Sequence, residues 1–127
     1  MAMTKRLLPL LLLGWMVSGC STTITNLTPG QLARNSSGLY RFEVAWQSRQ
    51  HNIARETISP QVVIGLDTYP MQPTAVVSNH WEAMIPVPAS KDLLNYHFKF
   101  DYQYKAIPVR RPNSKLSRNY QLQITAP

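Results

Sequence analysis

The sequence predicts an all-β protein that folds as a single antiparallel β-sandwich of about seven strands. Apolar and polar residues alternate with a period of two over several short runs, and turn-forming residues separate these runs every ~8–12 positions. In addition, 10 of the 127 residues are proline, which interrupts a helix because it lacks a backbone N–H. We therefore expect one domain without any helix longer than one or two turns.

The clearest alternation covers residues 94–104. Six apolar or aromatic side chains share one face of an extended strand there: Leu94, Tyr96, Phe98, Phe100, Tyr102 and Tyr104. The residues between them, such as His97, Lys99 and Asp101, are polar and fall on the opposite face. A helix would scatter the aromatic side chains around its circumference, so the spacing predicts a strand whose aromatic face fills the core.

The other strands are predicted over shorter runs: residues 23–27, 39–46, 53–58, 61–66, 81–87 and 116–124. Within the last run Arg118 breaks the alternation, and 62–64 is a continuous β-branched stretch typical of a strand buried on both faces. Clusters of Pro, Gly, Asn and Ser mark the turns between the runs. This strand spacing indicates a sandwich of the immunoglobulin-like type, here without the cysteine pair of antibody domains. A small β-barrel is the alternative.

The first twenty residues have the pattern of an export signal. Lys5 and Arg6 form a basic start, an apolar run of about 11 residues follows, and small residues precede Cys20. The apolar run is well short of the ~20 residues that a helix needs to cross a bilayer. We therefore predict a signal peptide over residues 1–19 and no lasting transmembrane helix.

The end of this segment, Val17-Ser18-Gly19-Cys20, resembles the lipobox of bacterial lipoproteins. The resemblance implies cleavage before Cys20 and lipid on both its thiol and its new amino group. The thiol is the nucleophile for diacylglyceryl transfer, and small side chains at Ser18 and Gly19 let the peptidase approach the backbone. Two or three acyl chains hold a protein on a membrane stably, since each buried CH₂ contributes about 0.8 kcal/mol. An ordinary secretory signal with an incidental cysteine is the alternative.

The same resemblance implies a place in the bacterial cell envelope. In Gram-negative lipoproteins an Asp just after the cysteine tends to mark inner-membrane retention, and here Ser21 and Thr22 follow Cys20. The outer membrane is therefore favoured. The predicted organisation is a signal peptide (1–19), the lipidated cysteine with a short tether (20–32) and the β-sandwich domain (33–127).

The formal net charge of +7 invites a nucleic-acid interpretation. Two of these charges, Lys5 and Arg6, belong to the signal peptide. The remaining excess lies after residue 101, where no acidic residue occurs: Lys105, Arg110, Arg111, Lys115 and Arg118. We expect these residues either to form a solvated surface that deters edge-to-edge pairing or to contact an anionic partner such as envelope phosphates. Export predicts that nucleic acid is not that partner.

No motif predicts catalysis or a metal site. The three histidines, His51, His80 and His97, lack metal-ligand spacing, and a single cysteine excludes a disulfide framework and a cysteine-based zinc cage. His80-Trp81-Glu82 contains the H-x-E of zinc deaminases, but the downstream P-C-x-x-C is missing. None of the six carboxylates is singled out as half of an acid–base pair. We expect no catalytic residue, no metal and no cofactor apart from covalent lipid on Cys20.

Trp81, Tyr102 and Tyr104 are candidates for stacking on a sugar ring, because flat aromatic side chains on β-sandwich modules can bind carbohydrate faces. The runs Trp81–Pro88 and Tyr96–Phe100 are loosely similar to the W-E-x-x-[IVL] and Y-x-F-x-[FV] strands of starch-binding sandwiches. This similarity covers only two strands. It supports the sandwich fold more than it supports sugar binding.

These observations favour a lipid-anchored envelope protein with a binding or structural role, such as an accessory subunit at the membrane surface. The expected partners are the membrane itself and an envelope protein complex or acidic envelope polymer. An envelope glycan-binding module is the first alternative, and a small periplasmic hydrolase is the second. The fold alone does not choose among these roles, because one sandwich architecture serves many functions.

Overall fold

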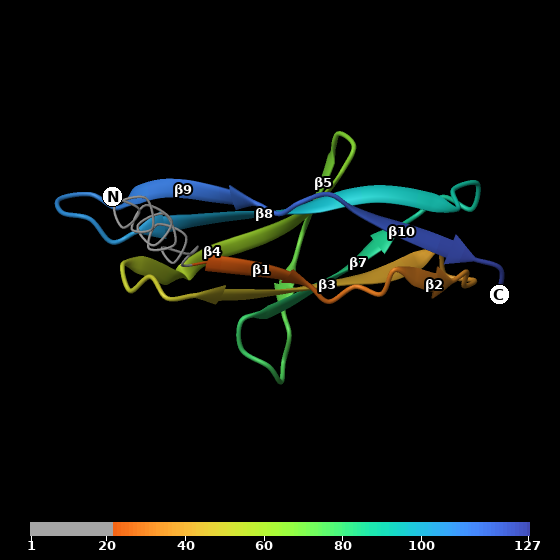
Figure 1. Cartoon of the computed structure of the whole chain (residues 1–127), viewed down its shortest axis with the longest axis horizontal. Coiled ribbons are helices and arrows are strands. Elements are labelled where there is room, and N and C mark those ends of the chain that lie inside the picture. The colour runs from red at the N-terminus through yellow and green to blue at the C-terminus, as the bar shows by residue number, and fades with distance from the viewer. Residues whose placement is uncertain (1–21) are drawn as a thin grey trace, which may run out of the picture.

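The computed structural model describes residues 22–127, and within them it contains ten strands and no helix (Figure 1). The predicted signal peptide, the lipobox and Cys20 lie outside the described residues. No helix in the described part of the chain is long and apolar enough to cross a membrane. The prediction of an all-β chain is confirmed for residues 22–127.

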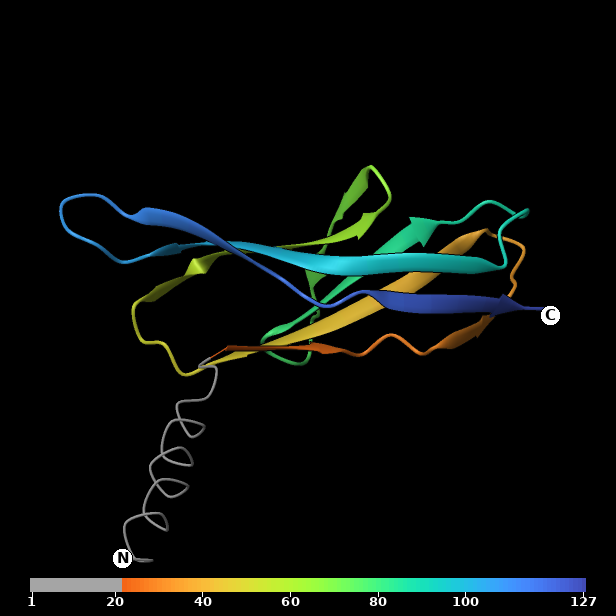
Figure 2. The same cartoon turned by 45° about the horizontal axis from the view of Figure 1, so that its top comes forward.

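The strands form two sheets. The first sheet has four strands in the order β1 (Thr22–Asn26), β3 (Leu39–Ser48), β7 (His80–Pro86) and β6 (Gln72–Pro73). The second has the order β2 (Gln31–Ala33), β10 (Tyr120–Thr125), β8 (Leu93–Tyr104), β4 (Ile53–Ile64) and β5 (Asp67–Pro70), with β9 (Arg111–Leu116) also paired to β8. All pairs are antiparallel except β2 with β10. Figure 2 shows the two sheets as stacked layers.

This strand order confirms the immunoglobulin-like sandwich. In chain order β1, β3, β6 and β7 correspond to strands A, B, D and E of one sheet, and β4, β8 and β10 to strands C, F and G of the other. The number of strands is larger than predicted. Residues 53–64 form one bulged strand instead of two, the run 116–124 divides between β9 and β10, and β2, β5 and β6 have only two to four residues. Strands this short show no measurable alternation.

The core lies between the sheets and is built from alternate residues of the longest strands. Five side chains of β8 are buried, as the alternation predicted: Leu94, Tyr96, Phe98, Phe100 and Tyr102. From β3 the ring of Phe42 lies 4.9 Å from that of Tyr96, and the ring of Trp46 lies 4.7 Å from that of Phe100. In antibody domains a disulfide joins the corresponding B and F strands; here aromatic contacts connect them.

The predicted strand over residues 23–27 corresponds to β1 (Thr22–Asn26), which pairs with β3 along its whole length. Strand β2 pairs with β10, so most of the segment assigned to a tether belongs to the two sheets. The segment is polar because an edge strand leaves one face in water, and Thr is favoured in strands.

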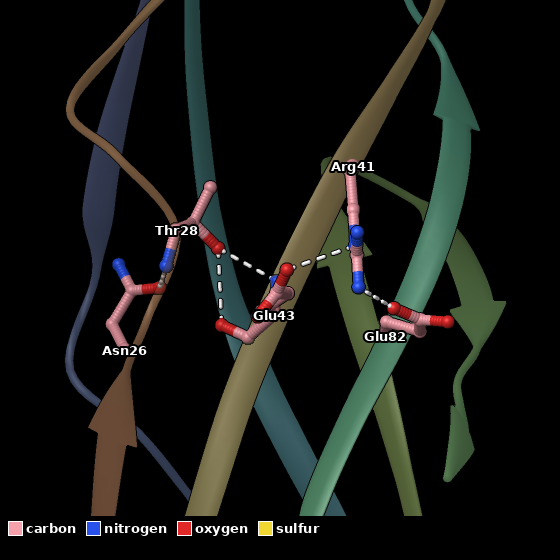
Figure 3. Close-up of polar contacts among 5 residues, drawn as sticks. All are labelled: Asn26, Thr28, Arg41, Glu43 and Glu82. Carbon is pink, nitrogen blue, oxygen red and sulfur yellow. Dashed lines mark hydrogen bonds and ion pairs between the residues drawn. The ribbon is translucent and has the colours of Figure 1, made fainter. Parts of the chain in front are cut away.

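A side chain extends the sheet where β1 ends (Figure 3). The Thr28 hydroxyl accepts a hydrogen bond from the Glu43 backbone N–H at 2.9 Å and donates one to the Glu43 carbonyl at 3.1 Å. The Asn26 Oδ1 accepts from the Thr28 N–H at 3.0 Å. Thr28 thus takes the place of a strand residue opposite Glu43, and it fixes the chain as it leaves the first sheet for the second.

A bulge in β4 shapes the end of the sandwich that carries the candidate site. Ala54 pairs with Gln103, whereas Ser59 pairs with Asp101, so the four residues 55–58 lie opposite the single residue Tyr102. The Thr57 hydroxyl bridges the gap by accepting from the Gln103 N–H at 2.9 Å and donating to the Ala54 carbonyl. The bulge brings Glu56 within reach of the β8–β9 loop.

Candidate functional site

Segments from three parts of the chain meet at one end of the sandwich (Figures 1 and 2). Thr22 pairs with Ser48 at the end of β3, and Ile53 at the start of β4 pairs with Tyr104 at the end of β8. The β3–β4 loop and the β8–β9 loop are joined by a hydrogen bond from the Lys105 N–H to the Asn52 carbonyl at 2.6 Å. The first described residue therefore lies at the same end as both loops.

This end is strongly basic, and we call it the basic end. Its basic side chains are Arg49, Arg55, Lys105, Arg110, Arg111 and Lys115. Its acidic side chains are Glu56 and Asp101, and Asp101 pairs with Ser114, one position nearer the tip than Lys115. Without Lys5 and Arg6, the formal net charge of +7 becomes +5 for the described residues. The remaining charges of residues 22–127, five basic and four acidic, sum to +1. A net charge of +4 of the described +5 therefore belongs to one end of the domain.

The basic end overlaps with the predicted cluster but is not identical to it. Four of the five predicted residues belong to it, whereas Arg118 lies beside the middle of β8, with its guanidinium 5.1 Å from the centre of the Tyr120 ring. Arg49 and Arg55 were missed. They are about fifty residues away along the chain, and only the pairing of β4 with β8 brings them to this end.

Two basic side chains of this end make contacts within the domain. Arg110 Nη1 lies 2.8 Å from Glu56 Oε1. A hydrogen bond with its own backbone and the Arg110 guanidinium lower the pKa of the Glu56 carboxyl, so Glu56 is charged at neutral pH. Lys115 Nζ donates to the Thr22 carbonyl at 2.8 Å. Lys105 and Arg111 are exposed and make no salt bridge with a described residue.

We expect Lys115→Met to lower the free energy of unfolding by about 1 kcal/mol, because it removes a charge-assisted hydrogen bond that fastens the start of β1. Lys105→Met is the control, since the Lys105 side chain is exposed and makes no such bond. Urea unfolding of both variants measures the difference. Equal midpoints for the two would contradict a fastening role for Lys115.

The tip of the β8–β9 hairpin combines these charges with exposed apolar side chains. Ile107 is 99% exposed and Val109 is 71% exposed. Pro108 lies between them and is also exposed. The sequence alone does not distinguish these residues, because a short apolar stretch has the same composition whether it is buried or projects into solvent.

A groove of about 670 Å³ lies near the start of the described chain. It is lined by β1 on one side and by Lys115, Leu116, Ser117 and Arg118 on the other. The groove runs where the edge of the first sheet faces the β9–β10 connection of the second. No hydrogen-bonded strand pair closes the sandwich there.

The three aromatic candidates for sugar stacking are not gathered at the surface. Tyr102 is only 6% exposed, and burial, with a hydrogen bond to Tyr104, raises its pKa to about 12. Trp81 belongs to the other sheet, where it is partly buried edge-on against Phe100 at 5.7 Å. The Tyr104 ring lies edge-on against Tyr102 at 5.5 Å. These side chains follow the core-facing alternation of their strands and do not form one exposed platform.

One pair of carboxylates is brought together, on the outer face of the first sheet (Figure 3). Glu43 on β3 pairs with Glu82 on β7, and Arg41 forms salt bridges with both, at 2.8 Å from its Nε to Glu43 Oε1. Cross-strand pairs of opposite charge stabilise a sheet, so the role of these three side chains is to stabilise the pairing of β3 with β7. Among residues 22–127, no group of three or more His, Cys, Asp or Glu side chains is placed to hold a metal ion.

Fold and site together define a small immunoglobulin-like β-sandwich with one strongly basic end. No family model matches the chain, and neither a curated protein nor a solved structure was found to match it.

Proposed function

We propose that the protein is a lipid-anchored protein of the bacterial cell envelope, attached through Cys20, with a binding or structural accessory role at the membrane surface. The lipobox-like motif Val17-Ser18-Gly19-Cys20 carries this proposal. The outer membrane is the favoured location, because no Asp follows the cysteine.

The position of β1 supports the proposal. Thr22 already pairs with Ser48 in the first sheet, and one residue, Ser21, separates it from Cys20 along the sequence. A fully extended chain covers at most about 3.6 Å per residue, so Cys20 and Thr22 lie within about 7 Å of each other. Lipid on Cys20 would therefore hold the sandwich directly against the membrane instead of on a flexible tether.

The charge distribution supports it as well. Thr22 lies at the basic end, next to Lys115, so an anchored domain presents its excess positive charge to the membrane. The cytoplasmic leaflet is a documented case in which anionic lipids attract basic residues near a bilayer, and envelope phosphates offer the same chemistry. The anchor and the charge thus act at the same place.

Mass spectrometry of the mature protein from isolated membranes tests the proposal. We expect the N-terminal peptide to begin at Cys20 and to carry the mass of a diacylglyceryl group and an amide-linked acyl chain. A variant with a bulky residue in the lipobox, Gly19→Trp, should accumulate uncleaved, whereas Ser21→Ala should be processed normally. An unmodified Cys20 thiol in the mature protein would exclude the proposed anchor.

A further inference from the structure

We propose that the tip of the β8–β9 hairpin, residues 105–110, is a second membrane contact. In this arrangement Ile107 and Val109 enter the interfacial layer of an anionic phospholipid bilayer, and the flanking basic side chains contact lipid phosphates. The orientation of the domain in this proposal depends on the proposed anchor at Cys20. The composition and exposure of the tip are independent of that anchor.

The tip has the chemistry of an interfacial membrane element. Two nearly unburied aliphatic side chains, Ile107 and Val109, are enclosed in sequence by Lys105 on one side and Arg110 and Arg111 on the other. Membrane-surface segments combine apolar side chains that enter the acyl boundary with basic side chains that remain at the headgroups. Single exposed apolar residues are common on proteins, so the combination with the basic residues carries the inference.

The tip is also free to reach a surface. The last pair of the hairpin is Tyr104 with Arg111, and the loop beyond it projects past the β3–β4 loop at the same end of the domain (Figures 1 and 2). The loop that contains Ile107 and Val109 therefore projects farthest at this end of the described molecule (Figures 1 and 2), where a flat bilayer can meet it.

The geometry of the hairpin fixes how the domain would lie. Lys115 touches Thr22, and four residues of strand separate it from Arg111, a distance of about 13 Å at the usual rise per residue. The tip lies farther still from the anchor. Both can touch one bilayer surface only if the sandwich is inclined, so that the edge running from Thr22 through Lys115 and Arg111 to the tip faces the lipid.

The electrostatics of the basic end agree with an anionic surface. Its six basic side chains are opposed by two carboxylates: Glu56, which forms a salt bridge with Arg110, and Asp101, which lies 3.8 Å from Lys99. Removing the Glu56 charge frees Arg110 for a lipid phosphate. From the usual gain per basic residue near an anionic membrane, we expect Glu56→Gln to favour insertion of the tip about fivefold.

A polarity-sensitive fluorophore on a thiol tests the contact in the full-length lipidated protein on vesicles. The label is placed at Ile107→Cys and, as a control, at Leu66→Cys in the β4–β5 turn, where Leu66 is equally exposed. On vesicles containing phosphatidylglycerol we expect blue-shifted emission at position 107 and water-like emission at 66. On pure phosphatidylcholine vesicles, or in added salt, the shift at 107 should shrink. Water-like emission at 107 on the anionic vesicles would overturn the proposal.

Matched charge changes sharpen the test. Lys105→Glu reverses a charge beside the tip and should lower insertion of the 107 label about 25-fold, as two units of charge predict. Lys91→Glu reverses an equally exposed lysine outside the basic end and should have no effect. If both variants behave alike, the contact is not electrostatic at this site. Free inorganic phosphate should not displace the tip, which distinguishes the lipid surface from a soluble phosphate ligand.

The same labelling separates this inference from the proposed anchor. A lipidated Cys20 has no free thiol, so the wild-type protein should take no fluorophore. Labelling of the wild type would refute the proposed anchor but would not test the hairpin contact. The emission of the label at position 107 would then be measured in the Cys20→Ser variant.

Discussion

Replacing Cys20 by serine is expected, from the proposed anchor, to abolish lipid attachment and to remove the protein from the membrane fraction. A serine hydroxyl is a far weaker nucleophile than a thiol, so the diacylglyceryl group is not transferred. Without that group the chain should keep residues 1–19. Metabolic labelling with an alkyne analogue of palmitate, followed by membrane fractionation and a gel that resolves the precursor from the mature chain, measures both effects.

Ser21→Ala is the matched control for this experiment, because it changes a neighbouring hydroxyl residue and leaves the thiol. It should incorporate the label and fractionate as the wild type does. Palmitate label that persists in the Cys20→Ser protein would show that the lipid is attached elsewhere. Processing of that variant before residue 20 would favour the ordinary secretory signal.

Phe100→Ala is expected to lower the free energy of unfolding by about 3–5 kcal/mol, the usual cost of truncating a buried aromatic side chain. Phe100 is fully buried, and its ring contacts Trp46 and Trp81 of the opposite sheet at 4.7 and 5.7 Å. Small domains have about 5–15 kcal/mol of stability in total, so the variant loses a large fraction of it. Denaturant unfolding monitored by tryptophan fluorescence measures the change.

The control for Phe100→Ala is Lys99→Ala, which alters the next residue on the outer face of the same strand. Its side chain is partly exposed and its nearest acidic atom, Asp101 Oδ1, is 3.8 Å away, so we expect a change of less than about 0.5 kcal/mol. A Phe100→Ala effect as small as that of the control would mean that the aromatic contacts between β3 and β8 do not hold the sheets together.

The long strands could be predicted from the sequence because the residues that each one buries alternate with polar residues along it. Every second residue of β8 from Leu94 to Tyr102 faces the core, and a period of two has no other simple explanation. The short strands could not be predicted in this way. Strand β6 has only two residues, and what places it in the first sheet is its pairing with β7.

The polar segment near residue 22 shows how composition and strand pattern can point in different directions. The polar run that contains Thr22–Asn26 has the composition of a linker, yet it is an edge strand held by five backbone pairs with β3. Composition reports how much of a segment faces water, and an edge strand faces water on one side. Which edge it occupies depends on a partner strand 18 to 26 residues away along the chain.

The candidate site divides in the same manner. The lipobox-like motif and the basic C-terminal segment are local patterns, so they could be predicted directly. The basic end is not local, because Arg49 and Arg55 lie there only through the pairing of β4 with β8. Arg118 lies outside it, because β9 runs away from that end and stops at Leu116, before residue 118.

By itself, the sequence determined the all-β class and the long strands, because each depends on neighbouring residues, and it contains the motif on which the proposed anchor rests. Only the tertiary structure decided that Thr22 belongs to the first sheet and that most of the excess charge lies at that same end. Backbone pairing between strands far apart in sequence sets both, and no local pattern encodes which strands will pair.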